Sequence, residues 1–217
     1  MSTTPPEPAS PEPTPPADLA ALREAIGSGD PVRAMPALAG LRQLEAEQAV
    51  PLLLLGLEQE PFLVRSLSCS GLGIKRNEAG WQALVAALAA DGDANVRAEA
   101  ANALASYGVE RAWPLLRESF ARDDQWLVRC SILSALAEQP QIARELLLEL
   151  AEMAIADADG TVRVGGAEIL GRLAQEAARA DPPVAGGWGD AARQRLRLLQ
   201  QDPDHRVVAA ALNGLQS

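Results

Sequence analysis

Apolar positions recur between residues 17 and 217 with the spacing of amphipathic helices, and a Val-Arg pair marks most recurrences. The pairs are Val32-Arg33, Val64-Arg65, Val96-Arg97, Val128-Arg129 and Val162-Arg163. Successive pairs lie 32, 32, 32 and 34 residues apart. A period of this length is typical of repeats that stack into a solenoid.

The positions that follow each arginine repeat as well. Three, six and seven residues after Arg97 stand Ala100, Ala103 and Leu104, and the other copies carry small or apolar residues at most of these places. Together with the valine, these positions fall on one stripe of a 3.6-residue helix. A sixth copy, Val207-Val208, ends the chain with valine in place of arginine.

Each of these helices is preceded by a turn and by a second amphipathic segment. Asp93, Asp159 and Asp204 stand three residues before the valine, where an aspartate caps the free N–H groups of a first helical turn. We therefore predict units of helix, tight turn and helix that bury their apolar faces only by stacking. The units cover about 17–44, 45–77, 78–108, 109–139, 140–178 and 189–217, with an exposed loop at about 176–188.

Composition supports an all-α fold and adds a tail. Hydrophobic residues make up 48% of the chain but aromatic residues only 3%, so alanine and leucine, which are good helix formers, supply the core. Residues 1–16 contain seven prolines, which disfavour helix, and we predict a disordered tail there.

The charge, the apolar stretches and the cysteines limit which partners and which cell compartment fit the chain. The formal charge of −10 repels phosphate backbones, and the basic residues look dispersed, with Lys75 the only lysine, so we predict no nucleic-acid partner. The longest apolar stretch, 49–57, is too short for membrane insertion. Cys69 and Cys130 form no disulfide framework, and no signal peptide is visible, which favours a cytoplasmic protein.

The pattern Asp-x-x-Val-Arg-x-x-Ala-x-x-Ala-Leu, best seen in 93–104 and 159–170, resembles the short HEAT-like repeats of the cyanobacterial phycobilisome lyase repeat family. The resemblance implies a right-handed α-solenoid of about six short HEAT-like helix pairs. Members of that family include bilin lyase subunits, which attach or remove a tetrapyrrole on phycobiliprotein cysteines, factors of phycobilisome breakdown, and plain adaptors. The chain is also similar to HEAT-repeat proteins that partner an A-type iron–sulfur carrier.

Two sets of residues are candidates for a site. The first is a structural ladder in which aspartates and arginines of stacked units pair in a row: Asp93, Arg97, Arg129, Asp159 and Arg163. The second is a partner-binding set, taken from the helix face opposite the core stripe (one, five and eight residues after the arginine) and from tryptophans near turns: Ser70, Asn102, Trp126, Cys130, Ser134, Glu168 and Trp188. His205 is the only histidine and has too few partners nearby for a triad or a zinc site.

These features favour a non-enzymatic protein-binding scaffold, serving phycobilisome or metal-cluster protein assembly or turnover in a cyanobacterium. The partners expected are phycobiliproteins or an iron–sulfur carrier. We predict no catalytic residue, no metal ligand and no resident cofactor. The alternatives are a bilin lyase or chromophore-detaching subunit, which would bind bilin, and a partner of an A-type iron–sulfur carrier.

Overall fold

The computed structural model describes residues 18–180 and 187–216, and within them the chain is an all-α solenoid without strands. The helices are α1 (Leu19–Ile26), α2 (Pro31–Gly40), the 3-10 helix η1 (Leu41–Gln43), α3 (Ala46–Leu57), α4 (Phe62–Lys75), α5 (Glu78–Ala90), α6 (Ala94–Ala105), α7 (Val109–Arg122), α8 (Trp126–Ala137), α9 (Arg144–Ile155), α10 (Gly160–Arg179), α11 (Gly187–Leu199) and α12 (His205–Leu215). Consecutive helices pair as units, each with an odd-numbered first helix and an even-numbered second helix. The predicted tail at 1–16 lies outside the described residues.

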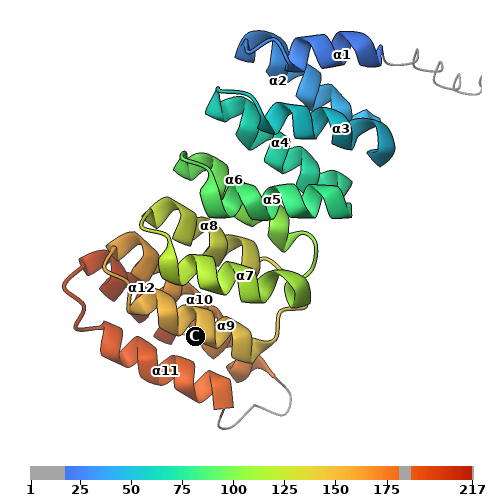
Figure 1. Cartoon of the computed structure of the whole chain (residues 1–217). Coiled ribbons are helices and arrows are strands. Elements are labelled where there is room, and N and C mark those ends of the chain that lie inside the picture. The colour runs from blue at the N-terminus through green and yellow to red at the C-terminus, as the bar shows by residue number, and fades with distance from the viewer. Residues whose placement is uncertain (1–17, 181–186, 217) are drawn as a thin grey trace, which may run out of the picture.

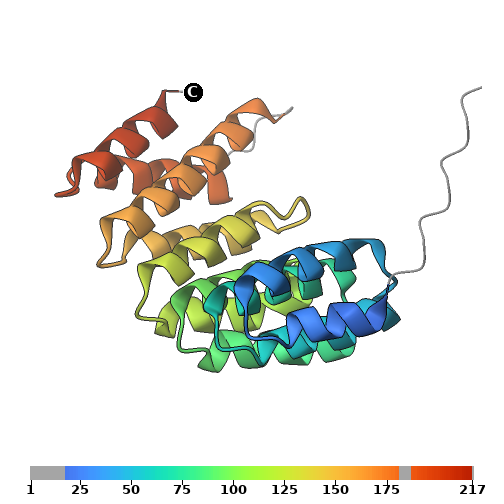
Figure 2. The ribbon, with the colours of Figure 1, turned by 90° about the horizontal axis from the view of Figure 1, so that it is seen from above.

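The units stack in one direction, from α1 and α2 at one end to α11 and α12 at the other (Figure 1). Neighbouring second helices pack closely on one another, whereas neighbouring first helices touch sparingly. The stack therefore curves with the second helices on its inner side. Seen from above, the last unit is displaced sideways from the first, so the stack also twists (Figure 2).

The predicted caps are present. Asp93, Asp159 and Asp204 each precede a second helix and accept the backbone N–H of the residue two positions later, at 2.8, 2.7 and 2.9 Å. These bonds satisfy donors that a helix end otherwise leaves without partners. The turn chemistry thus fixes where α6, α10 and α12 begin.

The first Val-Arg pair does not follow the pattern of the others. Val32 is 81% exposed, and the buried stripe of the second helix in this unit runs through Ala34, Ala37 and Leu38. The cap Asp30 stands two residues before Val32 instead of three, so α2 starts later relative to the motif. A shift of one residue turns a side chain by about 100° around a helix, and this rotation takes Val32 out of the core.

The predicted loop at 176–188 is too long. α10 continues to Arg179 and α11 begins at Gly187, so both ends of the predicted loop are helical. Residues 181–186 lie outside the described part of the chain. The continuous pattern of Leu173, Ala174 and Ala177 on the buried side explains why α10 extends beyond the length of the other second helices.

Small residues allow the second helices to approach closely. A Cβ atom on Gly73 of α4 would lie 2.9 Å from the Cα of Ala103 in α6, and one on Gly171 of α10 would lie 3.0 Å from the Cα of Gly214 in α12. Backbone atoms cannot move aside as a flexible side chain can. These positions therefore require glycine because of the helix that lies next to them.

We expect Gly73→Ala to destabilise the fold and the matched change Gly40→Ala to stabilise it. Alanine gains up to about 1 kcal/mol of helix propensity at either site. At Gly40 nothing lies within 4 Å of the added Cβ, so the gain remains. At Gly73 the helices must separate, at a cost of about 1–3 kcal/mol. Urea unfolding measures both changes, and a stabilised Gly73→Ala protein would contradict the close packing.

Candidate binding surface

Four arginine–aspartate pairs join consecutive units along the edge that carries the turns. They are Arg65–Asp91, Arg97–Asp123, Arg129–Asp157 and Arg163–Asp202, with Nε to Oδ2 distances of 2.7, 2.8, 2.6 and 2.9 Å. In each pair a second bond joins Nη2 to Oδ1, so the contact is bidentate. The arginine side chains are at most 18% exposed and the aspartates at most 11%. Buried bidentate pairs of this kind are stronger and more directional than single surface ion pairs.

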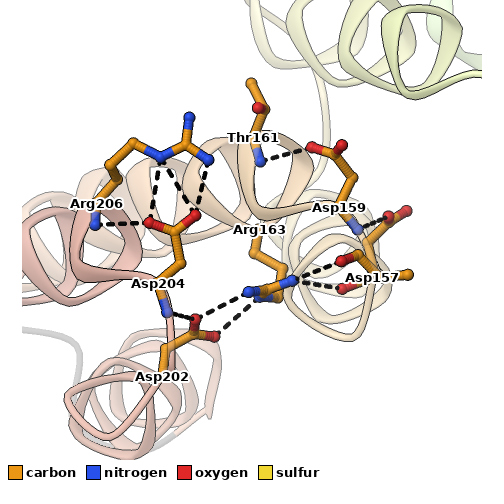
Figure 3. Close-up of polar contacts among 8 residues, drawn as sticks. Asp157, Asp159, Thr161, Arg163, Asp202, Asp204 and Arg206 are labelled. Carbon is orange, nitrogen blue, oxygen red and sulfur yellow. Dashed lines mark hydrogen bonds and ion pairs between the residues drawn. The ribbon is translucent and has the colours of Figure 1, made fainter.

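Each pair is anchored to the backbone on both sides. Arg163, in the first turn of α10, also donates from Nη1 to the carbonyl of Asp157 in its own turn, at 3.1 Å (Figure 3). Asp202 accepts the backbone N–H of Asp204 at 2.8 Å. The same arrangement holds at Arg129, Asp123 and Asp157. One pair therefore fixes two consecutive turns relative to each other.

These four pairs form a ladder of arginines and aspartates, but the prediction that Asp93 and Asp159 belong to it was wrong. Asp93 and Asp159 cap their helices and form no ion pair with the arginine four residues later. Asp91 and Asp157, two residues earlier, form the pairs instead, and each stands six residues before the arginine of its own unit. Position 59 carries glutamine at this place, so Arg33 has no such acceptor and pairs instead with Glu24 on the surface, at 2.9 Å.

The ladder lowers the pKa of three of its aspartates, Asp91, Asp123 and Asp202. Burial raises the pKa of Asp91, but the hydrogen bond from Arg65, the backbone N–H of Asp93 and the positive charge of Arg65 outweigh it, and the pKa is lowered. The same causes act on Asp123 through Arg97. At Asp202 the hydrogen bond from Arg163 is the largest cause, and its pKa is also lowered. These three aspartates therefore stay ionised into acid.

We expect the ladder to make stability depend on pH below about 5. The folded pKa of Asp91, Asp123 and Asp202 lies below the unfolded value of about 3.9, so the unfolded chain binds more protons in this range. The stabilisation is complete above the unfolded pKa and is lost as the pH falls through the folded pKa. The melting temperature of Asp91→Asn should be lower than that of the natural chain at pH 7 and should fall less between about pH 5 and 3. Equal slopes for the two proteins would contradict this.

The surface left open on the inner side of the stack is a row of side chains on the second helices, which we call the inner row. It holds residues two before and two, five and nine after the arginine: Leu63, Leu67, Ser70 and Ile74 on α4; Asn95, Glu99, Asn102 and Ser106 along α6; Leu127, Ser131, Ser134 and Glu138 along α8; Thr161, Gly165, Glu168 and Arg172 on α10. None of them is buried. Spacings of four, three and four residues keep them on one helix face.

Four predicted partner-binding residues lie in this row: Ser70, Asn102, Ser134 and Glu168. The other positions of the predicted face were out by about one residue around the helix. Residues one and eight positions after the arginine face the neighbouring second helix and not the inner side of the stack. Ala98 and Ala105 are buried there, and so is Gly171. Tight helix packing, and not an approaching ligand, explains the small residues at these places.

The cysteines are not exposed nucleophiles. Cys130 is half-buried beside the inner row and packs against the core, and burial raises the pKa of its thiol. Cys69 is fully buried, and burial raises its pKa to about 12. A thiol that stays protonated at neutral pH is a poor nucleophile and a poor metal ligand.

The two predicted tryptophans differ. Trp126 is the first residue of α8 and is 46% exposed at the turn edge, as an interface anchor would be. Trp188 is half-buried in the first turn of α11 and packs against the core.

His205 is exposed at the start of α12, and no group of three metal-binding side chains occurs among residues 18–180 and 187–216. Within those residues no helix is long and apolar enough to cross a bilayer.

The comparisons with known proteins agree with this architecture. The family described as HEAT repeats matches residues 50–137, from α3 to the end of α8. An engineered protein of known structure shares 18% identity and a TM-score of 0.51, over 92% of this chain and 96% of its own. A search of curated proteins finds no significant match.

Two further structures match the chain with TM-scores below 0.5. The complex of CpcE and CpcF of phycocyanin lyase from Nostoc sp. PCC7120 has 22% identity and a TM-score of 0.39, covering 90% of this chain and 96% of that one. Human deoxyhypusine hydroxylase in complex with glycerol has 15% identity and a TM-score of 0.47, covering 91% and 94%. Together the repeated units, the all-α stack and the family match show a solenoid of stacked helix pairs that carries HEAT repeats over residues 50–137.

Proposed function

We propose that this chain is a non-enzymatic protein-binding scaffold and that the inner row is its binding surface. The supporting observation is that the ladder and the glycine contacts fix the units in register while the inner row stays open across four of them. An extended surface on a fixed stack suits the recognition of a protein better than the enclosure of a small substrate.

The sequence resemblance to phycobilisome lyase repeat proteins suggests which partners to test first. Phycobiliproteins come first and an A-type iron–sulfur carrier second, both in the cytoplasm of a cyanobacterium. Binding through the inner row does not need a reactive thiol, because Cys130 lies half-buried beside the row. The proposal therefore includes a complex that survives Cys130→Ala.

Site-specific photo-crosslinking tests the proposal. A benzophenone amino acid is placed at Asn102 or Glu168 in the inner row, or at Ala121 as a control exposed on the first helix α7. Each protein is irradiated with purified phycobiliprotein or iron–sulfur carrier and with cyanobacterial lysate. We expect discrete adducts from Asn102 and Glu168, also in the Cys130→Ala background, and none from Ala121. No adduct from the inner row, or equal adducts from Ala121, would reject the proposal.

A further inference from the structure

The inner row changes character along the stack. On α4 it is apolar apart from Ser70, and Leu63 and Ile74 are 44% and 47% exposed. On α6 the same positions hold Asn95, Glu99, Asn102 and Ser106. Beyond α4 the row holds one large apolar residue, Leu127 on α8. Exposed large apolar side chains gathered at one end of a mainly polar surface mark a place where another molecule covers them.

A cavity adjoins this apolar stripe between α2 and α4. Its volume is about 240 Å³, and its walls include Leu38 and Leu41 from the first unit, Leu53 from α3, and Leu67 and Ile74 from α4. The 3-10 helix η1, which follows α2 at Leu41, contributes Leu41 and Arg42 to this lining. This volume is below the usual range for small-molecule sites and suits one large apolar side chain.

Two cations, Arg42 and Lys75, stand at the end of the same groove and line the cavity. Arg76, the next residue at the end of α4, is not part of the cavity wall. Lys75 donates to the carbonyls of Arg42 and Leu44, and Arg76 donates to the carbonyl of Ser106. Neither Arg42 nor Lys75 forms an ion pair with a carboxylate of the described residues. This cluster could not be recognised in the sequence, because Arg42 is one repeat away from Lys75 along the chain.

From these observations we propose that the groove between α2 and α4 binds an acidic amphipathic helix of a partner protein. Leu63, Leu67, Ser70 and Ile74 repeat at four, three and four residues, which is the spacing at which a second helix packs into a groove. One large apolar side chain of the partner fills the cavity. Aspartates or glutamates at one end of the partner helix pair with Arg42 and Lys75, whose positive charge stands out in a chain of net charge −10.

The inference rests on the proposed scaffold function and adds the chemistry of the partner. The two can fail separately. Adducts from Asn102 and Glu168 without any preference of the groove for acidic helices would leave the scaffold in place and remove this inference alone.

Peptide display on the full-length chain tests the inference. A library of random peptides, each as long as α4, is selected on the immobilised protein. We expect enriched peptides to carry large apolar residues at helical spacing with a cluster of aspartate or glutamate at one end. Enrichment without acidic residues, or no enrichment, would overturn the proposal.

Two variants and two controls locate the binding. The affinity of the best peptide, measured by fluorescence anisotropy, should fall at least about tenfold for Arg42→Glu and for Ile74→Asp. Arg23→Glu, at an exposed arginine on α1, and Leu198→Asp, at an exposed leucine on α11, should change it less than about twofold. Circular dichroism confirms that all four variants are folded. Equal affinity for Arg42→Glu and the natural chain would also overturn the proposal.

A photo-crosslinking amino acid at Ala39, which lines the cavity, shows which molecule occupies the groove. In the presence of the selected peptide we expect an adduct with the peptide. An adduct only with residues 1–17 of the same chain, or only with a second copy, would show that the groove is filled by the protein itself and would reject the partner helix.

Discussion

Replacing Arg129 by alanine should lower the free energy of unfolding by about 3 kcal/mol, because it leaves a buried aspartate without its partner. Asp157 is 8% exposed and holds two bonds from Arg129 in addition to the backbone N–H of Asp159. With the arginine removed, its charge stays in a poorly solvated place. The loss should therefore exceed that of an ordinary surface ion pair.

The matched control is Arg33→Ala. Arg33 also forms an ion pair at 2.9 Å, but its side chain is 51% exposed and its partner Glu24 is 76% exposed. Surface pairs of this kind contribute about 0–1 kcal/mol. Urea denaturation at neutral pH measures both variants, and equal losses at Arg129 and Arg33 would show that the ladder contributes no more than a surface pair.

Leu104→Ala and Leu196→Ala should each remove about 2–5 kcal/mol from the unit that holds them but should unfold the chain differently. Both leucines are fully buried, Leu104 in α6 at the centre of the stack and Leu196 in α11 in the last unit. In a stack each unit contacts only its neighbours. Weakening the centre removes support from units on both sides, whereas weakening the end affects only one neighbour.

We therefore expect a single, shifted unfolding transition for Leu104→Ala. For Leu196→Ala we expect an early partial loss of helix followed by a main transition close to that of the natural chain. Far-ultraviolet circular dichroism during urea titration distinguishes the two shapes. A single transition of the same midpoint for both variants would mean that the chain unfolds as one unit, without the one-dimensional behaviour of a stack.

The repeat period and the caps allowed the helix pairs to be predicted, because both depend on neighbours in sequence. Asp93 and Asp159 cap the helices that follow them, as local geometry requires. The register of the first unit failed because the valine–arginine motif was aligned without its cap. Asp30 is one residue closer to Val32 than the other caps are to their valines, and this small change rotates the side chain out of the core.

The ladder partners and the inner row depend on contacts between units and were harder to predict. Asp91 and Asp93 are two residues apart, and only the stacking of two units decides which one meets Arg65. The regular interval of six residues from Asp123 to Arg129 and from Asp157 to Arg163 was the available signal. The basic groove end was missed for the same reason, since Arg42 and Lys75 meet only across a unit boundary.

Two double-mutant cycles on Arg163 test the central claim most directly, because they ask which aspartate couples the units. One cycle pairs Arg163→Ala with Asp202→Ala, in the next unit, and the other pairs it with Asp159→Ala, the cap of the same helix. We expect a coupling energy of about 1.5–3 kcal/mol with Asp202 and less than about 0.5 kcal/mol with Asp159. A larger coupling with Asp159, or none with Asp202, would contradict a ladder that ties each unit to the next.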